Sequence, residues 1–189
     1  MQLLLILSVL SAASSVVVAQ EITVETRLEE GGITVTARPD AALRDAALEI
    51  PAYLHSGLRS EITFEIRVYR PRRFLSFLGD HLVLETALTQ EARWDPYAEC
   101  YTIHDTGERT APGEPRRFTD EGNFLSAYLA LEGRRVEVSD CPEADCPYVK
   151  VRARLYPIQI ADNLRITVLF RPAGTVTTPW ATSALEGSP

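Results

Sequence analysis

The stretch EITFEIRVY at residues 61–69 decides the fold class of this chain. Its apolar members fall at every second position, namely Ile62, Phe64, Ile66 and Val68. The positions between them carry charged or polar side chains. Because successive side chains of a β-strand point to opposite faces, this alternation predicts a strand with one buried and one exposed face.

The same alternation recurs along the chain and predicts a mainly β protein. The predicted strands cover residues 22–28, 33–37, 62–69, 82–94, 100–104, 134–138, 149–156 and 164–171. Turn residues at 29–32 (Glu-Glu-Gly-Gly) and 95–98 (Asp-Pro-Tyr-Ala) each lie between two of these strands. Both arrangements predict antiparallel hairpins.

Two stretches, residues 39–54 and 119–131, predict helices. The first begins at a Pro-Asp pair and is rich in Ala and Leu, and Pro51 should end or kink it. The second opens with Thr-Asp-Glu, which suits a helix N-terminus, and should stop at Gly133. The predicted fold is therefore an antiparallel β-sandwich of about eight strands with one or two helices packed on it, an α+β arrangement.

The length of 189 residues fits one domain. We expect a single β-rich domain over residues 20–171. Residues 106–117 are rich in Gly, Pro and charge and predict an exposed loop. Residues 172–189 predict a poorly ordered tail, in which Trp180 can serve as an anchor.

The N-terminal residues 1–19 (MQLLLILSVLSAASSVVVA) carry no charged side chain. An apolar run followed by Val-Val-Ala predicts a signal peptide that is cleaved between Ala19 and Gln20. An uncleaved membrane anchor is the alternative, although serines interrupt the run. We therefore expect an exported protein, periplasmic or secreted, with no transmembrane segment in the mature chain.

The charge balance excludes one class of partner. The chain has 26 acidic residues against 19 Lys and Arg, which gives a formal net charge of −7. Binding to nucleic acid needs clustered positive charge, so we expect no nucleic acid partner.

The three cysteines favour a structural interpretation. Cys141 and Cys146 flank a short polar turn, and in an oxidising compartment the sequence predicts a disulfide between them. Cys100 is then the odd thiol, which is most often a small buried apolar residue. The alternative is a metal site formed by all three cysteines with His104, but residues four apart in a strand lie about 13 Å apart.

Three segments of the chain resemble those of a known family. They are residues 61–73, a strand followed by Arg-Pro; residues 92–101, a Trp-Asp-Pro-Tyr hairpin; and residues 148–157, a long strand followed by Leu164. In this order they resemble the bacterial exported family catalogued as domain of unknown function 4390. The resemblance implies export, and it brings no activity and no catalytic residues.

The search for catalytic motifs predicts a protein that is not an enzyme. The sequence contains no Gly-x-Ser-x-Gly elbow, no His-Glu-x-x-His, no phosphate loop and no dinucleotide fingerprint. His104 and Asp105 are neighbours in a predicted strand, so their side chains should point to opposite faces. We predict no catalytic, cofactor-binding or metal-binding residues. The alternatives are a small periplasmic hydrolase with an unrecognised site and a carrier of an apolar ligand.

Two surfaces are candidate contacts. The first carries Lys150, Arg152 and Arg154 on one face of a predicted strand, where they could bind an anionic lipid, a polymer or an acidic partner. The alternative is a solvated face on which these cations pair with acidic residues of a neighbouring strand such as Glu61 and Glu65.

The second candidate surface follows the strand at residues 61–69. Its cations and its aromatic residues are Arg70, Arg72, Arg73, Phe74 and Phe77. A basic start followed by large apolar side chains is typical of an interfacial membrane contact, and the alternative is packing on the core. The sequence thus favours an exported, non-enzymatic envelope protein that binds an envelope protein or a membrane surface.

Overall fold

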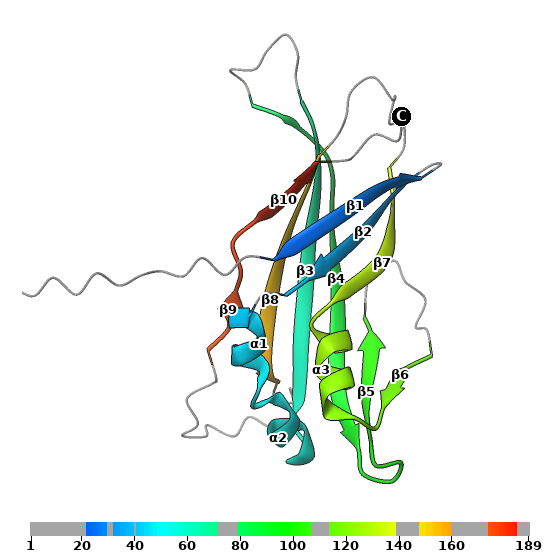
Figure 1. The fold of residues 1–189 in the computed structure, drawn as a ribbon, viewed down its shortest axis with the longest axis vertical. Helices are drawn as coiled ribbons and strands as arrows, with labels where there is room; N and C mark the ends of the chain where they lie inside the picture. Colours follow the sequence, from blue (N-terminus) through cyan, green and yellow to red (C-terminus); the bar gives the residue numbers. More distant parts are fainter. Residues whose placement is uncertain are drawn as a thin grey trace, which may run out of the picture.

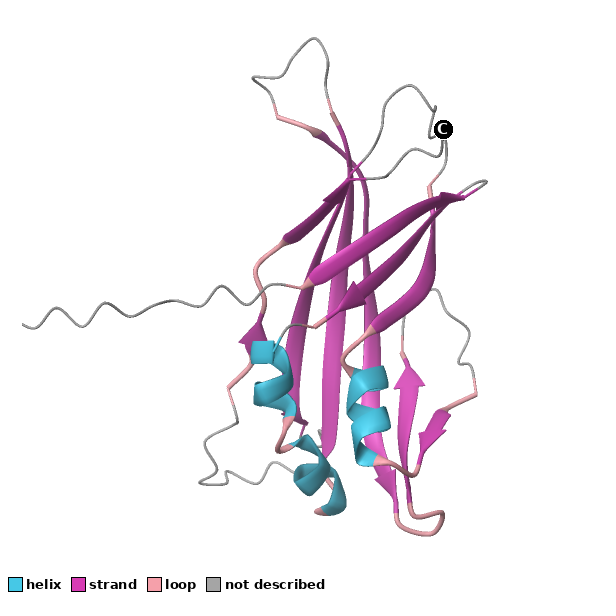
Figure 2. Cartoon of the chain, in the orientation of Figure 1, coloured by secondary structure: helices cyan, strands magenta, loops and turns pink. Residues whose placement is uncertain are grey.

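Ten strands and three helices make up the described part of this computed structural model, which comprises residues 22–29, 32–39, 41–71, 79–106, 114–138, 148–159 and 174–184 (Figures 1 and 2). In chain order the elements are β1 (Thr23–Glu29), β2 (Gly32–Arg38), α1 (Ala41–Ala47), α2 (Ile50–His55), β3 (Arg59–Arg70), β4 (His81–Asp95), β5 (Cys100–Asp105), β6 (Arg116–Phe118), α3 (Glu121–Tyr128), β7 (Leu131–Glu137), β8 (Tyr148–Gln159), β9 (Val176–Thr177) and β10 (Ala181–Ala184).

The strands form two antiparallel sheets. A small sheet has the order β1-β2-β7, and a large sheet has the order β10-β8-β3-β4-β5-β6 with β9 also paired to β8. In Figure 1 the small sheet crosses the upper part of the large sheet, and the three helices lie along its lower part. Side chains from both sheets and all three helices share one apolar core, so the small sheet and the helices cover the same face of the large sheet. The predicted sandwich-like α+β fold is confirmed.

β3 lies at the centre of the large sheet. It pairs antiparallel with β4 on one side and with β8 on the other over most of its length. Buried and half-buried residues alternate along β3, and Ile62, Phe64 and Ile66 are at most 1% exposed. The strand predicted from the alternation is confirmed, and its partners supply the neighbouring parts of the same buried face.

The predicted helix at residues 39–54 is two helices. α1 ends at Ala47, and α2 begins at Ile50 with Pro51 in its first turn. A proline ring clashes with the carbonyl group four residues before it, which here belongs to Ala47. The break therefore falls before Pro51, where the proline is tolerated in the first turn of a new helix.

The second predicted helix is shorter than expected. Asp120 caps α3 by accepting a hydrogen bond from the backbone N–H of Asn123 at 2.7 Å, and the helix ends at Tyr128. Leu131 already belongs to β7 and is fully buried there. Gly133 has a φ of 55° within β7, so this glycine serves an irregular strand rather than a helix stop.

Within the predicted poorly ordered tail at residues 172–189, the structure describes residues 174–184, which include two short strands. β9 and β10 both pair with β8, and between them Thr178 is 2% exposed. Its backbone N–H donates to the carbonyl oxygen of Ala153, and its Oγ1 accepts from the N–H of Ala153, both at 3.0 Å. These residues are held by hydrogen bonds to the edge of β8, and the local sequence does not reveal this pairing.

Two other predictions concern the loop at residues 106–117 and the strand at residues 164–171. Within the predicted loop at residues 106–117, Arg116 begins β6, a short strand that pairs with β5. The strand predicted at residues 164–171 lies outside the described residues, as do the signal segment 1–19 and the predicted cleavage site at Ala19 and Gln20.

Candidate binding face

The uncovered face of the large sheet gathers the polar residues of its central strands. Glu65 and Arg67 of β3 alternate with its buried side chains and are partly exposed. The register places Arg152 of β8 opposite Glu65 and Lys150 opposite Arg67. Pairing of β8 with β3 therefore brings the predicted cations next to a strand with residues of both charges.

Glu65 neutralises two of the predicted contact residues. Arg154 Nε lies 2.8 Å from Glu65 Oε1, and Arg152 Nε donates to Glu65 Oε2 at 3.1 Å. The Glu65 side chain is 17% exposed, so this cluster is partly shielded from solvent. Such pairs fix the orientation of the side chains more than they stabilise the fold. This part of the face agrees with the alternative interpretation, in which the cations pair within the sheet.

Lys150 differs from its neighbours. Its Nζ lies 5.2 Å from the ring centroid of Tyr69 and 5.6 Å from that of Tyr148. The two rings are stacked, with their centroids 5.3 Å apart. Within the described residues no carboxylate lies at ion-pair distance from Lys150, whereas Arg67 pairs with Glu85 at 2.7 Å. Lys150 is therefore a cation held by aromatic rings rather than by an acid.

Tyr148 also connects this face to the segment that precedes β4. Its hydroxyl group donates a hydrogen bond to Asp80 Oδ2 at 2.5 Å. This hydrogen bond, aided by partial desolvation, raises the pKa of Tyr148 to about 12. The phenol therefore stays protonated at neutral pH and fixes the end of the connection between β3 and β4.

Trp180 anchors the C-terminal strands to the same face. The guanidinium carbons of Arg67 and Arg152 lie 4.6 Å and 4.4 Å from its ring centroid. These contacts account for the anchoring role that the sequence suggested for this tryptophan. Sequence reasoning did not include Tyr69, Tyr148 or Arg67 in the contact surface, although strand alternation places Tyr69 and Arg67 on the face opposite the core.

The second predicted surface is only partly described. Arg70 is the last residue of β3, so it lies at the end of the sheet where Tyr69 and Tyr148 stack. Arg72, Arg73, Phe74 and Phe77 lie outside the described residues. The structure thus places Arg70 and Lys150 at one end of one sheet.

The surroundings of His55 and His104 follow from the elements that carry them. His55 Nε2 lies 3.1 Å from the hydroxyl oxygen of Tyr101, whose pKa is raised chiefly by burial. Asp105 forms ion pairs with Arg134 and Arg116, whereas His104 lies in register with Glu91 on β4. The expected separation of His104 from Asp105 follows from the alternation of β5.

The cysteine predictions are tested at one position. Cys100 is a free thiol and is 4% exposed, as expected for a small buried residue. Cys141 and Cys146 lie outside the described residues. Among the described residues, no three His, Cys, Asp or Glu side chains are grouped so that they could hold a metal ion. The helices within the described ranges are also too short or too polar to cross a membrane.

Comparison with known proteins gives a family but no function. No curated protein and no solved structure matches the chain. The sequence pattern of the family described as "Domain of unknown function (DUF4390)" matches residues 18–183, which include every helix and strand described above except Ala184, the last residue of β10. The chain therefore belongs to the DUF4390 family.

Proposed function

We propose that this protein is an exported, non-enzymatic envelope protein that binds an anionic membrane surface through the end of the large sheet where β3 meets β4. The observation that carries this proposal is the position of Lys150, which lies over Tyr69 and Tyr148 without a described carboxylate partner. Tyrosine beside a basic side chain is a combination that suits the boundary between headgroups and acyl chains.

In the sequence, further cations and apolar side chains follow directly after the end of β3. Arg70 ends β3 there, and the sequence continues with Arg72, Arg73, Phe74 and Phe77. Burial of two phenylalanine side chains contributes on the order of 3–5 kcal/mol before the cost of ordering. Each nearby Lys or Arg adds about 1 kcal/mol at an anionic surface. These sums support a reversible contact rather than a permanent anchor.

Vesicle binding tests the proposal. The purified protein should cosediment with vesicles of phosphatidylglycerol and phosphatidylcholine, and much less with phosphatidylcholine alone. Lys150→Glu should reduce this binding about tenfold, because it reverses a charge that no described acid neutralises. Arg27→Glu, on the exposed strand β1, is the matched control and should bind like the wild type.

Two outcomes would contradict the membrane proposal. One is equal binding to anionic and neutral vesicles, and the other is equal binding by Lys150→Glu and Arg27→Glu. The pair Phe74→Ser and Phe77→Ser separates contact from core: unchanged melting with lost binding supports a contact. A large fall in melting temperature with unchanged binding would mean that these residues pack in the core.

Export and the disulfide belong to the same proposal. Support comes from the apolar segment 1–19 and from the short turn between Cys141 and Cys146. Mass spectrometry of the protein from cells should find Gln20 as the first residue, and intact residues 1–19 would contradict cleavage. Thiol labelling of the denatured, non-reduced protein should modify one cysteine, Cys100, and three labelled cysteines would contradict the disulfide.

A further inference from the structure

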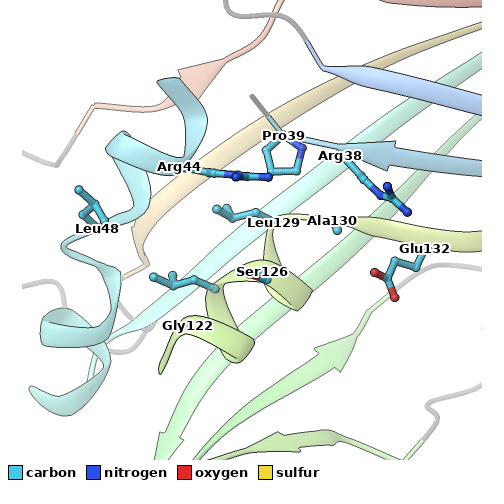
Figure 3. A pocket seen from close by; sticks show the side chains of 10 residues that line it. Arg38, Pro39, Arg44, Leu48, Gly122, Ser126, Leu129, Ala130 and Glu132 are labelled. Carbon is cyan, nitrogen blue, oxygen red and sulfur yellow. The ribbon is translucent and has the colours of Figure 1, made fainter. Parts of the chain in front are cut away.

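A groove on the opposite side of the molecule lies between α1 and α3 (Figure 3). It has a volume of about 360 Å³ and is lined by residues from the end of β2, from both helices and from the start of β7. Sites for small molecules in proteins range over about 300–1,000 Å³. The groove is therefore large enough for one small ligand.

The floor and one rim of the groove are aliphatic. Leu129 and Ala130 are 2% and 5% exposed and form part of the lining together with the half-buried Leu125. Leu48 lies at the rim and is 64% exposed. Among the described residues, no other large aliphatic side chain is as exposed. Covering this leucine removes apolar surface from water, which favours a ligand with an aliphatic part.

Two arginines flank the same groove. Arg38 and Arg44 are exposed, contribute to the lining and have no ion-pair partner among the described residues. Most arginines of the large sheet do have an acidic partner, namely Arg59, Arg67, Arg93, Arg116, Arg152 and Arg154. Among the described residues that line the groove, Glu132 is the one carboxylate, so these residues together carry a net positive charge in an acidic protein.

We infer that this groove binds a single-chain anionic amphiphile, with its aliphatic chain on Leu48, Leu125 and Leu129 and its anionic headgroup at Arg38 and Arg44. A guanidinium group presents a planar set of donors that fits a carboxylate or a phosphate. The volume lies at the low end for ligand sites, which suits one aliphatic chain better than a peptide segment. This inference is independent of the vesicle contact, since it concerns the helix-covered face of the large sheet.

Calorimetry with defined probes tests the inference. The protein as recovered from expressing cells is titrated with dodecanoate and with dodecyl phosphate, both below the concentrations at which they form micelles. Saturable binding is expected for at least one of them, and the two probes distinguish a carboxylate headgroup from a phosphate headgroup. Dodecyl maltoside, with the same chain and no charge, and acetate, with charge and no chain, should each bind at least tenfold more weakly.

Two substitutions locate the site. Leu48→Ser and Arg44→Glu should each weaken binding of the better probe about tenfold or more, and both positions are exposed, so the melting temperature should stay within a few degrees. Leu28→Ser and Arg27→Glu on β1 are the matched controls, because Leu28 is also a partly exposed leucine at 36%. The controls should bind within twofold of the wild type.

Several results would overturn the inference. The first would be that neither anionic probe binds saturably. The second would be that dodecyl maltoside binds as tightly as dodecanoate. The third would be that the groove variants and the β1 variants lose binding equally. Binding of an acidic peptide in the absence of binding by both amphiphiles would also overturn it. A failure of this test leaves vesicle binding through Lys150 unaffected, since the two sets of variants lie on different faces.

Discussion

The two faces of β3 make different kinds of contact, although they are formed by alternate residues of one strand. On the inner face, Phe64 is 1% exposed and Ile66 is fully buried under the small sheet and the helices. On the outer face, the partly exposed Glu65 and Arg67 make ion pairs, and Arg67 also lies over the ring of Trp180. Apolar burial dominates stability on the first face, whereas orientation of charge dominates on the second.

Substitutions on the two faces of β3 should differ in their effect on stability. Substitutions on the inner face should reduce the free energy of unfolding strongly, because they leave cavities among close-packed side chains. Substitutions on the outer face should have small effects on stability and can therefore be used to test binding.

The largest effect is expected for Phe64→Ala. Loss of a fully buried phenylalanine should lower the free energy of unfolding by about 3–5 kcal/mol. Thr63→Ala, on the outer face of the same strand, removes a hydrogen bond with Thr89 Oγ1 at 3.1 Å and should cost about 1 kcal/mol or less. Denaturant unfolding of both variants measures the difference, and equal losses would contradict the assignment of the two faces.

Trp180→Ala should have an intermediate effect. It removes the contacts of the indole ring with Arg67 and Arg152, and two such contacts at a partly exposed site are worth about 1–2 kcal/mol. Hydrogen exchange should become faster in β10 while β3 stays protected. Thr182→Ala, an exposed residue of β10, is the control and should leave exchange unchanged. Uniformly faster exchange throughout the large sheet would show that Trp180 does more than hold the C-terminal strand.

Glu65→Gln should change stability by less than about 1 kcal/mol, although Glu65 pairs with two arginines, because partly exposed ion pairs are worth little. The loss should shrink further at high salt. Glu65→Gln should have a larger effect on vesicle binding, since Arg152 and Arg154 lose their acidic partner. Vesicle binding should therefore increase, and a decrease would indicate that Glu65 itself contacts the ligand.

The smallest effect concerns pH and Tyr148. Its pKa is about 12 in the folded chain against 10.0 for an unperturbed tyrosine, so the folded state holds this proton more tightly. The resulting stabilisation is complete below pH 10 and is lost as the pH rises toward 12. Tyr148→Phe should therefore lose less stability than the wild type over this interval, and Asp80→Asn should behave similarly. Parallel curves for all three proteins would contradict the link between Tyr148 and Asp80.

Much of the fold could be predicted because the decisive signals are local. Alternation at residues 61–69 predicted β3, and the turn residues at 29–32 and 95–98 predicted the two hairpins that the structure contains. Element ends were predicted less well. Leu131 looked like a helix residue because of its apolar side chain, but its burial in β7 decided its conformation.

The candidate binding face could be predicted only in part. Alternation placed Lys150, Arg152 and Arg154 together on one side of a strand, and this is what the register shows. The partners of these cations come from residues far away in sequence, including Glu65 and Trp180. No spacing rule connects them, because the pairing of β3, β8 and β10 brings them together.

The sequence by itself determined the strand pattern, the acidic charge, the hairpins and the resemblance to a family. Each depends on side chains that are close in sequence, where periodicity and turn chemistry suffice. Only the tertiary structure decided that β9 and β10 form near the C-terminus, that Lys150 lies over two tyrosines, and that Leu48 and Arg44 face a groove beside α3. These features depend on which strand edge is open for pairing and on which helix lies beside another, and such contacts are selected by packing of the whole chain.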